Sequence, residues 1–134
     1  MNGQSIIEEV RGRLEVCGLF NLSGGYYING MRPFNSKNED CIVSFFNGYD
    51  GQIQEGYVTI NIYVNDLLYS DGQYHCDVVR TGDIAAQMEH IPDTLNQMSD
   101  VLFQPFSMIQ TFEDVPTKQH YVSMRIRFKY LNVE

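Results

Sequence analysis

Basic side chains are scarce in this sequence of 134 residues: 9 Lys and Arg stand against 17 Asp and Glu, which gives a formal net charge of −8. This balance opposes attraction to phosphate groups and to anionic bilayers, so it argues against tight nucleic-acid binding. Cysteine is also scarce. The three widely spaced residues Cys17, Cys41 and Cys76 favour reduced thiols in a cytoplasm over a disulfide framework.

A cationic leader and long apolar runs are missing as well. Glu8 and Glu9 interrupt the only early hydrophobic stretch, and no segment approaches the ~20 consecutive apolar residues that span a bilayer. We therefore expect synthesis in the cytoplasm and no membrane partner. The 43% of hydrophobic residues excludes disorder over the whole chain and predicts a single domain over residues 1–134.

The first predicted element is an amphipathic helix over residues 5–17. Ser5 and Glu8 have the spacing of a capping box, and Gly18 is placed to end the helix. The apolar residues at helical spacing are Ile6, Ile7, Val10 and Leu14. This stripe predicts that one side of the helix packs on the core.

Strands are predicted at residues 26–31, 41–46 and 57–64. In the last of these, strict alternation places Val58, Ile60, Ile62 and Val64 on one face and Tyr57, Thr59, Asn61 and Tyr63 on the other. Such alternation is typical of an antiparallel sheet that is covered on a single side. Residues 65–76 are predicted to form a long exposed loop.

The second half of the chain predicts another helix and a hairpin. An apolar stripe with helical spacing, which includes Met88 and Met98, runs over residues 84–98, and Pro92 should kink or break the helix. Segments 102–112 and 119–131 are predicted as two paired strands. The expected fold class is α+β: an antiparallel sheet of four to five strands, with the N-terminal helix and a second, kinked helix packed on one face.

No motif specifies a reaction. The residues His75–Asp77 are adjacent in sequence and lack the spacing with which metal ligands converge, and Cys41 lies in an apolar strand where a thiol behaves as a core residue. Gly24–Gly25 precedes a strand and lacks the Lys-Ser/Thr of a phosphate-binding loop. The acidic pairs fall mainly in predicted loops. We therefore predict no catalytic residues, no cofactor, no metal and no enzymatic activity.

Five residues are candidates for an oligomer interface: Tyr57, Tyr63, Arg125, Arg127 and Lys129. The tyrosines stand on the polar side of their strand and suit an interface, although a partly covered sheet face explains them equally well. The three basic residues share one face of the last strand, where they either protect an edge strand or contact an acidic partner. Between positions 38 and 117 the chain has thirteen acidic residues and one basic residue, Arg80. Another copy of the same chain could therefore be the acidic partner.

The order of these elements resembles the tail terminator, or tail completion, proteins of tailed phages and prophages. The likeness covers nearly the whole chain: a leading helix, a strand pair with an acidic tip at residues 47–56, the strand at 57–64, the helix at 84–98 and a closing hairpin. It implies a structural protein that forms a ring, commonly a hexamer, caps the tail tube and joins it to the head-side connector. DNA would only pass through the lumen.

Two other classes of function stay open. A small α+β ligand-binding or enzymatic domain would enclose a pocket between helices and sheet, with a buried polar group such as His90 or His120. An acidic inhibitor that mimics a nucleic acid is compatible with the charge, but no motif supports it.

Overall fold

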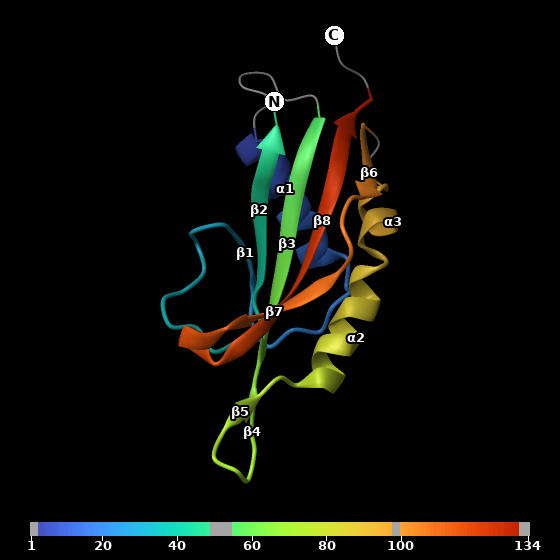
Figure 1. Ribbon diagram of the computed structural model, residues 1–134. Coiled ribbons are helices and arrows are strands. Elements are labelled where there is room, and N and C mark those ends of the chain that lie inside the picture. The colour runs from blue at the N-terminus through green and yellow to red at the C-terminus, as the bar shows by residue number, and fades with distance from the viewer. Residues whose placement is uncertain (1–2, 49–54, 98–99, 132–134) are drawn as a thin grey trace.

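One twisted sheet with helices on a single face organises the computed structural model, which describes residues 3–48, 55–97 and 100–131 (Figure 1). In chain order the elements are α1 (Gly3–Val16), β1 (Tyr26–Ile28), β2 (Cys41–Gly48), β3 (Glu55–Asn65), β4 (Leu67–Leu68), β5 (Tyr74–His75), α2 (Val78–Met88), α3 (Ile91–Leu95), β6 (Val101–Pro105), β7 (Gln110–Asp114), the 3-10 turn η1 (Val115–Thr117) and β8 (Gln119–Tyr130). The order of strands in the main sheet is β1-β2-β3-β8-β6, and β7 also pairs with β8. The described chain is therefore α+β, as the sequence predicts.

The two central strands are paired over their full length, from Glu55 opposite Lys129 to Asn65 opposite Gln119. Burial alternates along β3 as the sequence predicts, because Val58, Ile60, Ile62 and Val64 are at most 2% exposed. On β8 the buried alternate residues are Val122, Met124, Ile126 and Phe128. Both strands therefore turn the same face toward the helices, and the opposite face is left open.

The helices supply the other side of the core. The predicted stripe of α1 is buried at Ile6, Ile7, Val10 and Leu14, and α2 and α3 bury Ile84, Met88, Ile91 and Leu95. Burial of a large aliphatic side chain contributes about 1.5–3 kcal/mol, so these residues are the main source of stability for the helical layer. Met88 is a core residue, as predicted, whereas Met98 lies outside the described residues.

The sheet differs from the prediction in strand number and direction. It has six strands, and the short β1 pairs in parallel with β2, whereas an all-antiparallel sheet of four to five strands was expected. The extra strand comes from segment 102–112, which is not one strand. Both β6 and β7 pair with β8, and residues 106–109 separate them, with the amides of Phe106 and Ser107 both donating to the carbonyl of Arg125. This bulge interrupts the edge of the sheet.

The second helix, predicted over residues 84–98, begins earlier in the structure and is divided into α2 and α3. Helix α2 begins at Val78, where the Asp77 side chain accepts from the Arg80 amide as an N-cap, and it ends at Met88. The break precedes Pro92, which lies in the first turn of α3, where a missing N–H costs little. The apolar periodicity continued across the break because α2 and α3 pack on the same sheet face.

Three smaller boundaries also shift. Helix α1 begins at Gly3, so Ser5 lies inside its first turn and is not an N-cap. The strand predicted at 26–31 ends at Ile28. Residues 65–76, predicted as a loop, contain the hairpin of β4 and β5, and part of the predicted acidic tip, residues 49–54, lies outside the described residues. Of the helices that the structure describes, none is long and apolar enough to cross a membrane.

Candidate interaction surface

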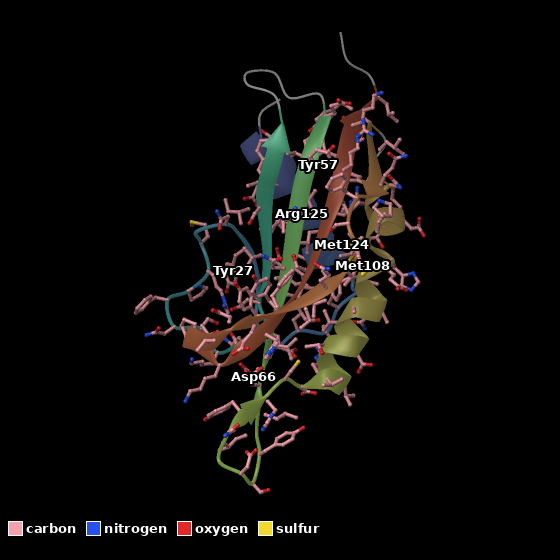
Figure 2. The ribbon with its side chains drawn as sticks, in the orientation of Figure 1. Tyr27, Tyr57, Asp66, Met108, Met124 and Arg125 are labelled. Carbon is pink, nitrogen blue, oxygen red and sulfur yellow. The ribbon has the colours of Figure 1, made fainter. Side chains whose placement is uncertain are left out.

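The open face of the sheet carries four of the five predicted interface residues at one end. In the β3–β8 register, Arg127 lies opposite Tyr57, Arg125 opposite Thr59 and Lys129 opposite Glu55. Alternation along β8 keeps the three basic side chains on the face away from the helices. Figure 2 shows Tyr57 and Arg125 in the same upper part of the sheet.

An aromatic residue that the sequence did not single out completes this surface. The ring of Phe106, which lies in the bulge, contacts the ring of Tyr57 with centroids 4.3 Å apart. Phe106 is 51% exposed and the nearby bulge residue Met108 is 78% exposed. We call Tyr57, Phe106, Arg125, Arg127 and Lys129 the basic-aromatic patch. Exposed Arg and aromatic side chains side by side are the composition of interaction hot spots.

One basic residue of the patch pairs with the neighbouring strand. Arg127 forms a salt bridge with Glu55, with Nη2 and Oε2 3.2 Å apart, and both side chains keep a third or more of their surface exposed. Exposed pairs of this kind contribute ~1 kcal/mol or less, so they can exchange partners at small cost. At this end of β3 and β8, three basic residues lie beside the acidic Glu55 in a chain whose net charge is negative.

Tyr63 does not belong to the patch. Tyr63 lies six positions after Tyr57 along β3, which corresponds to a distance of about 20 Å at strand spacing. The guanidinium of Arg32 lies 3.9 Å from the centroid of its ring, and the ring of Tyr121 is 5.2 Å away. Burial, with a smaller contribution from the negative charge of Asp114, raises the pKa of Tyr63. The structure therefore places Tyr63 in an intramolecular cluster at the other end of the open face.

Residues 29–40, here called the strap, form a loop that extends to the side of β1 and β2 (Figure 1). Asp40 is 1% exposed and accepts hydrogen bonds from the Gly25 amide at 3.0 Å, from Arg32 Nε at 2.8 Å and from the Ser36 hydroxyl. Arg32 Nη2 donates to Gln119 Oε1 at 2.9 Å, which ties the strap to β8. A buried ion pair therefore fixes the strap beside Tyr63.

Acidic side chains gather on the helices instead. Asp83, Glu89 and Asp93 are exposed on α2, on the turn after it and on α3, and we call them the acidic helical surface. Arg80, the one basic residue of these helices, is bound to Glu39 through Nε and Nη2 at 2.7 and 2.8 Å, which raises the pKa of Arg80. The helical layer therefore presents negative charge, whereas the patch presents positive charge.

Residues considered for chemistry are placed apart from one another. Cys41 is fully buried, and that burial raises the pKa of its thiol. His90 is exposed, His75 pairs with Asp71, and His120 Nδ1 lies 2.6 Å from Asp66 Oδ1. Among the residues that the structure describes, no three His, Cys, Asp or Glu side chains are grouped so as to hold a metal ion.

A pocket of about 240 Å³ lies at the end of the sheet away from the patch. Its lining residues are Lys37, Asn65, Asp66, Tyr74, Thr117 and Lys118. Lys37 Nζ donates to the Thr117 carbonyl at 3.0 Å, and Lys118 Nζ lies 4.4 Å from the centroid of the Tyr74 ring. Both lysines are therefore already engaged by the chain itself. The lining residues are of polar types, but their apolar atoms supply most of the surface of the pocket.

No protein-family model matches this chain, and no curated protein matches it with significance.

Proposed function

We propose that this chain is a structural subunit that assembles with copies of itself into a ring, in the manner of the phage tail terminators that its sequence resembles. The ring would cap a tail tube, contact the tube and the head-side connector proteins, and leave a lumen for DNA. The subunit would be made in the cytoplasm and end in the virion tail. The main support is one observation: the chain carries a basic-aromatic patch and an acidic surface on different layers.

Two unlike, complementary surfaces on one chain favour head-to-tail association. When surface A of one copy binds surface B of the next, the contact is heterologous, and the chain of contacts closes into a ring if the rotation allows it. Positive potential on the patch and negative potential on α2 and α3 steer such an encounter. The overall charge of −8 still opposes tight binding of DNA, which fits a lumen through which DNA slides.

Concentration and salt test the self-association. We expect native mass spectrometry and sedimentation to show a discrete oligomer at low ionic strength and its dissociation as salt is added, because salt screens charges that lie near the surface. A monomer at every concentration and salt tested would contradict the proposal.

Charge reversal tests the patch. The variant Arg125→Glu/Arg127→Glu, called the patch variant, should weaken assembly about tenfold or more, because it turns attraction to the acidic surface into repulsion. The control variant Arg11→Glu/Arg13→Glu makes the same change in net charge on α1, outside the patch, and should assemble as the wild type does. Equal assembly by the patch variant would remove the patch from the interface.

The phage role has its own test. Purified tail tubes mixed with the protein should carry a ring at one end in negative-stain images, and the gene should lie beside portal, capsid and tape-measure genes. Assembly in solution without binding to tubes would keep the self-associating subunit and reject its place in a tail.

A ligand-binding role ranks second, on the observation of the pocket beside Lys37 and Lys118. It predicts that a small anion stabilises the protein against heat, and that Lys37→Ala abolishes this effect.

A further inference from the structure

A hairpin projects from the body of the protein at the end of the sheet opposite the patch (Figure 1). It comprises residues 66–76, here called the arm, in which Leu67 pairs with His75 and Leu68 with Tyr74. Its large side chains are exposed: Leu67 44%, Leu68 62%, Tyr69 50% and Tyr74 45%. Two further apolar side chains are exposed in the first turn of α2, which follows the hairpin in the chain: Val78 is 73% and Val79 is 76% exposed. Soluble proteins rarely expose contiguous apolar surface unless it binds something.

The arm has a defined shape. At its tip the Tyr69 amide donates to the Gln73 carbonyl at 2.9 Å, and the Tyr69 ring lies 4.3 Å from the His75 ring. At its base the Asp66 amide donates to the Lys118 carbonyl at 3.1 Å. A two-stranded hairpin of this size is marginal in water on its own, and these contacts hold it in place. A preordered arm loses little conformational entropy when it binds.

The charge of the arm indicates its partner. Residues 66–76 contain two Asp and no Lys or Arg, and the acidic helical surface follows directly along the chain. At the exposed tip, the hydrogen bond from the Gln73 amide, together with His75, lowers the pKa of Asp71, so this carboxylate stays negative. The surface that fits the arm is therefore basic and contains exposed apolar side chains. The patch of the same sequence has both properties.

A single molecule cannot bring its own arm to its own patch. From Tyr57 the strand β3 runs eight positions to its end at Asn65, about 26 Å at strand spacing, and the arm begins at the next residue. Figure 2 shows Asp66 at the lower end of the sheet, far from Tyr57 and Arg125. The contact must therefore join two copies.

We propose that the arm of one copy docks on the basic-aromatic patch of the next, with Leu68, the most exposed of the apolar side chains of the arm, against Phe106 and Tyr57 and with Asp71 facing the basic row of β8. This inference rests on the proposed self-assembly and names the element that makes the contact. Each copy then has one donor element and one acceptor surface, which is the arrangement that generates a ring.

Mixing two defective variants tests this pairing. The arm variant Leu68→Lys keeps an intact patch, and the patch variant keeps an intact arm, so each alone should be monomeric. The added lysine removes an apolar contact and repels the basic patch. Mixed in equal amounts, the two variants should form a one-to-one heterodimer and nothing larger, because only one productive contact is left. Native mass spectrometry distinguishes the two variants by mass. The matched control Val16→Lys places the same change on α1 at a residue that is 79% exposed, and it should assemble normally.

Each outcome decides a different claim. A heterodimer supports the arm-to-patch contact and shows that both variants are folded. If Leu68→Lys assembles as the wild type does, the arm is not the contact element, while the proposed self-assembly stands. If both variants are monomeric and the mixture stays monomeric, the arm and the patch do not bind each other. A wild-type protein that is itself monomeric overturns the self-assembly and the arm contact together.

Discussion

Replacement of Arg32 by methionine should destabilise the protein far more than the same replacement at Arg11. Arg32 donates to Asp40, which is 1% exposed, and stacks on Tyr63, so its loss leaves a buried carboxylate without its cation. Breaking a buried pair in this way costs about 3–5 kcal/mol. We expect the lower end, about 3 kcal/mol, because Asp40 keeps its bonds from Gly25 and Ser36.

The control makes the comparison specific. Arg11 also has two carboxylate partners, Glu8 and Glu15, but both are about half exposed, and exposed pairs contribute within about 1 kcal/mol. The assay is urea unfolding followed by circular dichroism, at a protein concentration where sedimentation shows one species. With a slope of about 2 kcal/mol per molar urea, Arg32→Met should lower the midpoint by about 1.5 M.

A second variant checks the cause. If the cost comes from the uncompensated charge of Asp40, then Arg32→Met/Asp40→Asn should recover part of the lost stability, because the amide is neutral. Equal midpoints for Arg32→Met and Arg11→Met would refute the reasoning. So would a double variant that is less stable than Arg32→Met alone.

The remaining predictions concern two glycines and a thiol. Gly12→Ala should raise the free energy of unfolding by about 0.5–1 kcal/mol, since the position is inside α1 and nothing lies within 4 Å of the added methyl; calorimetry checks it. Gly24→Ala should lower the melting temperature, because its Cβ would lie 2.0 Å from Asp40 Oδ1 and 2.6 Å from a backbone carbonyl; an unchanged melting temperature would be the contrary result. The wild type should lose stability as the pH rises above 9.0, the ordinary value for a thiol, because burial raises the pKa of Cys41 and the folded state holds that proton longer than the unfolded state. In Cys41→Ala, this loss of stability should begin only at pH 10.0, where Tyr26 starts to contribute because burial raises its pKa to about 12. The slope of the free energy of unfolding against pH, compared between the wild type and the variant, measures the contributions of Cys41 and Tyr26.

Much of the fold could be predicted because each buried face repeats with a simple period. The alternation of β3 and the stripe of α1 predicted which side chains are in the core. The basic row could be found for the same reason, since Arg125, Arg127 and Lys129 lie on one strand. In contrast, the two short strands of the arm have no alternation long enough to detect, so the sequence predicts a loop there.

The rest depends on contacts between segments far apart in the sequence. Phe106 joins the patch only because the bulge before β7 turns its ring onto Tyr57, and no local signal marks that position. Tyr63 and Tyr57 look equivalent along β3, but Arg32, from the strap, covers only Tyr63. The sequence predicts the break near Pro92 but not the start of α2 at Val78, because no residue of that helix before Thr81 is buried.

Native mass spectrometry of the wild-type protein over a range of concentrations at low ionic strength tests whether copies of the chain associate head to tail. The head-to-tail account predicts a single closed oligomer that forms as concentration rises and dissociates as salt is added, because unlike charged surfaces meet at every contact. A protein that stays monomeric up to its solubility limit would contradict the account.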